Sequence, residues 1–90
     1  MNMEEIAKYL KERVGLPEGK PVTGIYTNGF VSFTLQHISE GKALIYANTD
    51  IPYLELSEDE SREMGLEELT TLFVDLLGDF RLTRRLDEKY

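Results

Sequence analysis

Apolar residues at the start of the chain recur every three or four positions, which is the spacing of one helix face. Between residues 3 and 14 these positions are Met3, Ile6, Ala7, Leu10 and Val14. Gly15 and Pro17 follow them. Glycine adopts the left-handed conformation that ends many helices, and proline cannot continue the helical hydrogen-bond ladder. The pattern therefore predicts an amphipathic helix over residues 3–14.

After residue 21 the pattern changes to an alternation of apolar and polar positions, which is typical of half-buried strands. Two alternating runs, 22–27 and 30–38, flank Asn28-Gly29, a dipeptide that favours a two-residue hairpin turn. Such a turn pairs Thr27 with Phe30. We therefore expect one apolar, buried face on this hairpin, made of Val22, Gly24, Tyr26, Val31, Phe33 and Leu35.

A third alternating run covers residues 43–48, after a turn at 39–42. Pairing Ile38 with Ala43 places Leu44 and Tyr46 on the same apolar face as the hairpin. Three strands connected in this way form an antiparallel meander with one face that other elements must cover.

The segment that follows the third run contains one proline and one capping signal. Pro52 cannot donate a hydrogen bond within a central strand, so residues 51–56 are expected to form an edge strand or an extended loop. Ser57 and Glu60 match a capping box, in which the serine and a glutamate three residues later satisfy the first helical amides. This signal predicts a short helix over residues 58–64.

A longer helix is predicted over residues 66–77, and residues 80–86 could form a short strand or another helical turn. Together the elements predict a single α+β domain over residues 1–90. Its N-terminal helix precedes a three-stranded antiparallel meander with a possible fourth edge strand. Its C-terminal helix or helices pack on one face of that sheet.

Charge is distributed unevenly along this chain. Residues 1–49 carry five acidic and five basic groups, whereas residues 50–79 carry ten acidic groups and a single arginine. Residues 80–90 carry four basic and two acidic groups. The net charge of −7 therefore arises from one segment, which a short basic segment follows. A local negative field attracts basic partners and disfavours nucleic acid as a direct ligand.

These charges provide the candidate partner-binding residues, which are Glu58, Asp59, Glu60, Glu63, Glu67, Glu68, Arg81, Arg84 and Arg85. One interpretation of the acidic group is a docking surface for a basic protein. The simpler interpretation is a solvated helix face, since acidic residues stabilise the first turns of helices. The arginines either bind a phosphate or the acidic segment of a second subunit, or they stabilise a helix C-terminus.

Patterns typical of catalysis or metal binding do not occur in the sequence. The chain has no cysteine, and it contains neither a calcium-binding loop nor the Glu-x-x-His spacing of di-iron sites. A nucleophile elbow and a glycine-rich phosphate loop are also missing. His37 is the single histidine, and a general base needs a positioned partner and a pocket. We therefore expect no enzyme activity, cofactor or metal.

The leading hypothesis is a non-enzymatic interaction or adaptor protein, a homodimer that presents an acidic surface to a basic protein partner. A small core without disulfides favours dimerisation. One alternative is a DNA mimic or regulatory inhibitor, and another is a small ligand-binding or enzymatic domain with a site near His37. The sequence has no signal peptide, and no apolar run approaches the roughly 20 residues that cross a bilayer. We therefore expect a cytoplasmic protein that does not bind membranes.

Overall fold

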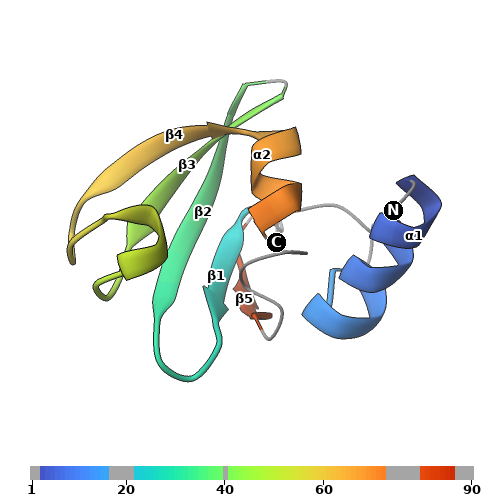
Figure 1. Ribbon diagram of the computed structural model, residues 1–90, viewed down its shortest axis with the longest axis horizontal. Coiled ribbons are helices and arrows are strands. Elements are labelled where there is room, and N and C mark those ends of the chain that lie inside the picture. The colour runs from blue at the N-terminus through green and yellow to red at the C-terminus, as the bar shows by residue number, and fades with distance from the viewer. Residues whose placement is uncertain (1–2, 17–21, 40, 73–79, 87–90) are drawn as a thin grey trace.

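The computed structural model describes residues 3–16, 22–39, 41–72 and 80–86. Its main element is an antiparallel sheet with the strand order β4-β3-β2-β1-β5 (Figure 1). The strands are β1 (Gly24–Thr27), β2 (Ser32–Ser39), β3 (Lys42–Ala47), β4 (Ser61–Gly65) and β5 (Arg81–Arg85). The helices are α1 (Met3–Tyr9), continued by a π-helical turn (Leu10–Val14), and α2 (Leu66–Thr71), which follows β4. A 3-10 turn (Pro52–Leu54) lies between β3 and β4.

The predicted fold class is wrong. Instead of a three-stranded meander covered by C-terminal helices, the structure is mainly a five-stranded antiparallel sheet. The predicted helix over residues 58–64 is a turn followed by β4, and residues 80–86 contain β5. The first helix is confirmed, and Gly15 ends it in the left-handed conformation with φ of 85°. The second predicted helix begins at residue 66 as α2, and its predicted part over 73–77 lies outside the described residues.

The capping signal at Ser57 and Glu60 is used by a turn instead of a helix. The Ser57 N–H donates to the Glu60 carboxylate over 2.7 Å, as in a capping box, but the Glu60 N–H donates to the Ser57 carbonyl over 3.0 Å and closes a four-residue turn. The Glu60 carbonyl then accepts a hydrogen bond from the Ala47 N–H over 2.8 Å. Pairing with β3 satisfies the backbone groups of Arg62 and Met64, so a tertiary contact overrides the local helix signal.

The β1–β2 hairpin has a longer loop than predicted but the predicted faces. Thr27 pairs with Ser32 and not with Phe30, so the connection contains four residues. The Asn28 side-chain oxygen accepts the N–H groups of Phe30 and Val31, each over 2.9 Å. Because the register differs by two residues, and side chains alternate with a period of two, the predicted inner residues stay on one face. Of that face, Val31 is half-buried and the others are buried.

The third strand has its faces reversed relative to the prediction. Ala43 pairs with His37 instead of Ile38, because a bulge between His37 and Ser39 shifts the register by one residue. A one-residue shift moves every side chain of a strand to the opposite face. The buried residues of β3 are therefore Ala43, Ile45 and Ala47, whereas Tyr46 is 38% exposed on the outer face.

The last strand, β5, pairs with β1 at the edge of the sheet opposite to β4. Gly24 permits this pairing, since a Cβ atom at this position would lie 2.5 Å from the Arg84 carbonyl oxygen and 2.6 Å from a Leu82 methyl group. A bulge between Ile25 and Tyr26 interrupts the register, so that Tyr26 pairs with Leu82 and Ile25 pairs with Arg84. Thr83 is the extra residue.

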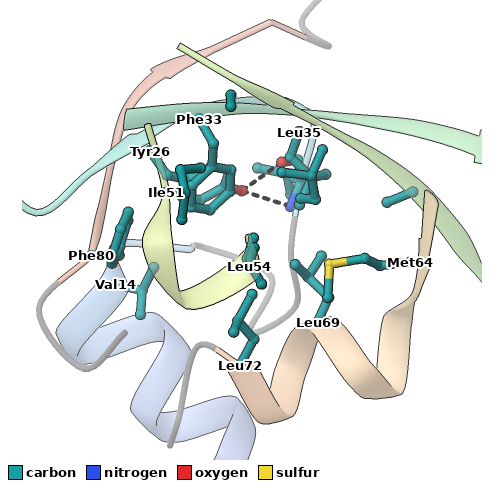
Figure 2. Packing of buried hydrophobic residues seen from close by; sticks show 14 of the residues in the cluster. Val14, Tyr26, Phe33, Leu35, Ile51, Leu54, Met64, Leu69, Leu72 and Phe80 are labelled. Atoms are coloured by element: carbon teal, nitrogen blue, oxygen red, sulfur yellow. Dashed lines mark hydrogen bonds between the residues drawn. The ribbon is translucent and has the colours of Figure 1, made fainter. Parts of the chain in front are cut away.

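The core lies on the inner face of the sheet and is centred on three aromatic rings (Figure 2). Phe33 stacks on Tyr26 with ring centroids 5.2 Å apart and lies 5.3 Å from Phe80. The buried Tyr26 hydroxyl donates to the Val22 carbonyl and accepts the Val22 N–H, so its polar atom is satisfied. Further buried side chains come from the first helix (Leu10, Val14), from α2 and the residue after it (Leu69, Leu72), and from the 3-10 turn and the residue before it (Leu54, Ile51).

Candidate functional site

The acidic candidate residues lie at the start of β4, on the turn before it and on α2. Glu58 and Asp59 are in the turn, Glu60 joins the turn to β4, and Glu63 is within the strand. We call these four residues the acidic edge, because β4 is the outermost strand on this side of the sheet. All four are exposed. Glu67 and Glu68 are exposed in the first turn of α2, directly after β4.

Hydrogen bonds hold the acidic turn in one conformation. The Asp50 carboxylate accepts the Glu58 N–H over 2.8 Å, and the Asp59 carboxylate accepts the Tyr46 hydroxyl over 2.6 Å. Asp59 has a φ of 71°, an uncommon value that aspartate tolerates better than most residues. The turn is therefore an ordered platform, and the carboxylates of Glu58 and Glu63 make no ion pair within the described part of the chain.

The carboxylates of the acidic turn change the pKa of the Tyr46 phenol. Its hydrogen bond to Asp59 raises the pKa of Tyr46 above the ordinary value, and partial desolvation and the charges of Asp59 and Glu58 raise it further. A tyrosinate at this position would face carboxylates, so the phenol stays a neutral hydrogen-bond donor into alkaline solution. Sequence reasoning missed Tyr46 as a site residue because the predicted register placed it in the core.

Arg62 is the single basic residue of the acidic segment over residues 50–79, and its guanidinium is held by a hydrogen bond within the fold. Its position pairs with Ile45 on the inner side of β3, and its guanidinium donates to the Leu54 carbonyl over 2.9 Å. This bond ties the 3-10 segment to β4. The arginine is therefore directed away from Glu63, which pairs with Leu44 on the outer face.

The basic candidate residues lie on β5, at the other edge of the sheet. Arg81 and Arg84 are exposed, and Arg85 is half-buried opposite Gly24. We call these three residues the basic edge. Strands β3, β2 and β1 separate the two edges, so the fold does not bring the predicted acidic and basic residues together into one surface (Figure 1).

The remaining sequence candidate, His37, lies in β2 opposite Ala43. Its side chain lies outside the described part of the structure, and so does any site built on it. Among the described residues, no three histidine, cysteine, aspartate or glutamate side chains are grouped so that they could hold a metal ion. None of the described helices has the length and apolar character needed to span a bilayer.

Comparison with known proteins does not identify a family. No family model matches the chain, and no curated protein or solved structure is significantly similar to it. The arguments about function therefore depend on the chain's own residues and on its fold.

Proposed function

We propose that this protein is a non-enzymatic interaction protein that binds a basic, extended segment of a partner protein along the acidic edge. The observation that carries the proposal is the combination of exposed carboxylates with the open side of an edge strand. Edge strands offer unpaired backbone groups to which an extended peptide can add as a further strand. The carboxylates select the charge of that peptide.

The backbone of β4 supports strand addition. The Glu60 carbonyl bonds to Ala47 of β3, and the direction of backbone hydrogen bonds alternates along a strand. Arg62 and Met64 therefore direct their backbone groups to β3, whereas Ser61 and Glu63 direct theirs to the open side. Among the described strands none pairs with this side. An added strand can bond to Ser61 and Glu63 without disturbing the sheet.

The charges of the acidic edge favour a lysine- or arginine-rich segment. A single-sign cluster raises the local concentration of oppositely charged partners and speeds their association. The one arginine nearby is bonded to Leu54 and does not shield Glu63. We infer a cytoplasmic role, because a chain without cysteine forms no disulfide and so needs no oxidising compartment to fold. No described contact favours the DNA-mimic or the His37 alternative, and both stay predictions.

A titration followed by amide NMR tests the proposal with an extended peptide of alternating lysine and valine. We expect shifts of the Ser61 and Glu63 amides, saturable binding at low salt, and loss of binding at about 1 M salt, where charges are screened beyond about 3 Å. Glu63→Lys should weaken binding about tenfold or more, because it places a positive charge beside the cationic peptide, and like charges opposed across an interface cost several kcal/mol, of which each 1.4 kcal/mol is about tenfold in affinity.

The matched control is Glu12→Lys, which makes the same charge change at an exposed position on the first helix. Equal weakening by both variants would mean that only the net charge matters. Peptide shifts confined to other strands would contradict binding at β4.

A further inference from the structure

We infer that the basic segment bound by the acidic edge is β5 of a second copy of this chain, so that copies associate head to tail through β4 of one and β5 of the next. This inference rests on the proposed function, because it uses the same edge. The partner is then a second copy of the chain, and the bound segment is β5, whose charged residues and their side of the sheet are described above.

The two outer strands of the sheet carry opposite charges. Glu63 and the turn before it give one edge a negative field, and Arg81 and Arg84 give the other edge a positive one. Neither Arg81 nor Arg84 makes an ion pair within the described residues. Charges that are unpaired on both edges of one molecule can pair between two molecules.

The charged side chains of both edges also lie on the same face of the sheet. Glu63 pairs with Leu44 and Arg84 pairs with Ile25, and both partners are half-buried outer residues. Arg81 pairs with Thr27, which lies on the same outer face as Ile25. A junction that continues the sheet from one copy to the next therefore brings Glu63 onto the same face as the arginines.

The bulge in β5 produces this alignment. Arg81 and Arg84 are three positions apart, and in a regular strand residues three apart lie on opposite faces. The extra residue Thr83 restores both arginines to the outer face, and its hydroxyl donates to the Ile25 carbonyl over 3.0 Å. Bulges commonly redirect side chains at sheet edges, and this one concentrates the positive charge where Glu63 can meet it.

Charge also excludes the wrong pairings. Two β4 edges would oppose carboxylates, and two β5 edges would oppose arginines, so a symmetric edge-to-edge dimer is disfavoured in both cases. The contact between β4 and β5 joins two different surfaces. Repetition of such a contact produces a ring or an open chain of copies, unlike an interface in which one surface meets itself.

Sedimentation velocity with charge-reversal variants tests the inference. We expect wild-type protein to sediment above its monomer mass of 10.4 kDa at low salt and to dissociate at about 1 M salt, where the screening length is about 3 Å. Glu63→Arg and Arg84→Glu should each sediment as monomers. An equimolar mixture of the two should associate again, because the intact β5 of the first variant meets the intact β4 of the second.

Folding and the proposed function are checked with the same samples. Both substituted residues are exposed, and circular dichroism of each variant should match that of the wild type. Glu12→Lys is the matched control and should keep the wild-type assembly. Wild-type monomers at low salt that still bind the lysine and valine peptide at β4 would overturn the inference and leave the proposed function intact. Failure of both association and peptide binding would overturn both.

A third result would also contradict the inference. If Glu63→Arg and Arg84→Glu each keep the wild-type sedimentation, or if their mixture stays monomeric while each variant is folded, the copies do not meet through β4 and β5.

Discussion

The aromatic centre and the acidic turn are held together by different forces within one sheet. Tyr26, Phe33 and Phe80 are fully buried and stabilise the fold through burial and ring packing. The turn at residues 57–60 is exposed and is held by hydrogen bonds that end on carboxylates. The stability of the aromatic centre should therefore depend on side-chain volume, whereas the stability of the acidic turn should depend on pH and charge.

Both regions nevertheless depend on β-strand register. The ring stack forms because Tyr26 pairs with Phe33, and the Tyr46 hydroxyl reaches Asp59 because the β2 bulge turns Tyr46 outward. One sheet can therefore carry an apolar core on its inner face and an ordered acidic turn at its edge within a single domain. Perturbing one region at a time tests this separation.

Phe33→Ala should have the largest effect, because it removes a ring that contacts both other aromatics. Truncation of a buried phenylalanine costs about 3–5 kcal/mol, a large part of the stability of a small domain, which is about 5–15 kcal/mol. Urea unfolding measures the loss. Phe30→Ala is the matched control, since Phe30 is 90% exposed and should change stability by less than about 0.5 kcal/mol. Equal losses in the two variants would contradict the assigned core.

Gly24→Ala should have an intermediate effect, because the added methyl group meets the Arg84 carbonyl and Leu82. Overpacking of this kind costs about 1–3 kcal/mol. The loss should appear first in β5, as faster hydrogen exchange of its amides. Gly65→Ala is the control, because the nearest atom to its added methyl group is the Gly41 carbonyl oxygen at an ordinary 3.9 Å. Unchanged exchange in β5 of the Gly24 variant would contradict the close approach of β5.

The smallest effect should come from the acidic turn and should depend on pH. The pKa of Tyr46 is raised in the folded state, so its hydrogen bond to Asp59 stabilises the fold fully below the unfolded tyrosine value of about 10. That contribution is lost as the pH rises through the raised folded value. Ultraviolet titration of the phenol should show late ionisation in the wild type.

Two variants separate the causes of this shift. Asp59→Asn should move the titration of Tyr46 back toward the ordinary value by more than Glu58→Gln does, since the hydrogen bond to Asp59 is the largest contribution and the charge of Glu58 is the smallest. The reverse order, or a wild-type phenol that titrates at its ordinary value, would contradict the hydrogen bond at the turn.

Local signals predicted the first helix and the two faces of the β1–β2 hairpin. Asn28-Gly29 located the turn, and the faces were correct although the loop was longer, because the error was an even number of residues. A single bulged residue before Ser39 was enough to reverse the faces of β3. No feature of the local alternation indicates such an insertion, so Tyr46 was misplaced and its bond to Asp59 was missed.

The sequence identified the charged residues of the candidate site but not where the fold places them. The exposure of the acidic residues follows from their charge, whereas their place on an edge strand follows from pairing with β3. The capping box at Ser57 favoured a helix, and that local preference could not reveal the competing strand partner. Likewise, the arginines acquire a common face from pairing with β1, which is far away in the sequence.

The pairing of β1 with β5 also fixes an order of events during synthesis. Ribosomes add about 5–20 residues per second, so β1 leaves the ribosome several seconds before β5 does. During that interval one side of β1 lacks its native partner strand. Slow, non-local strand closure of this kind exposes nascent chains to mispairing. This side of β1 therefore stays open to mispairing until β5 has left the ribosome and paired with it.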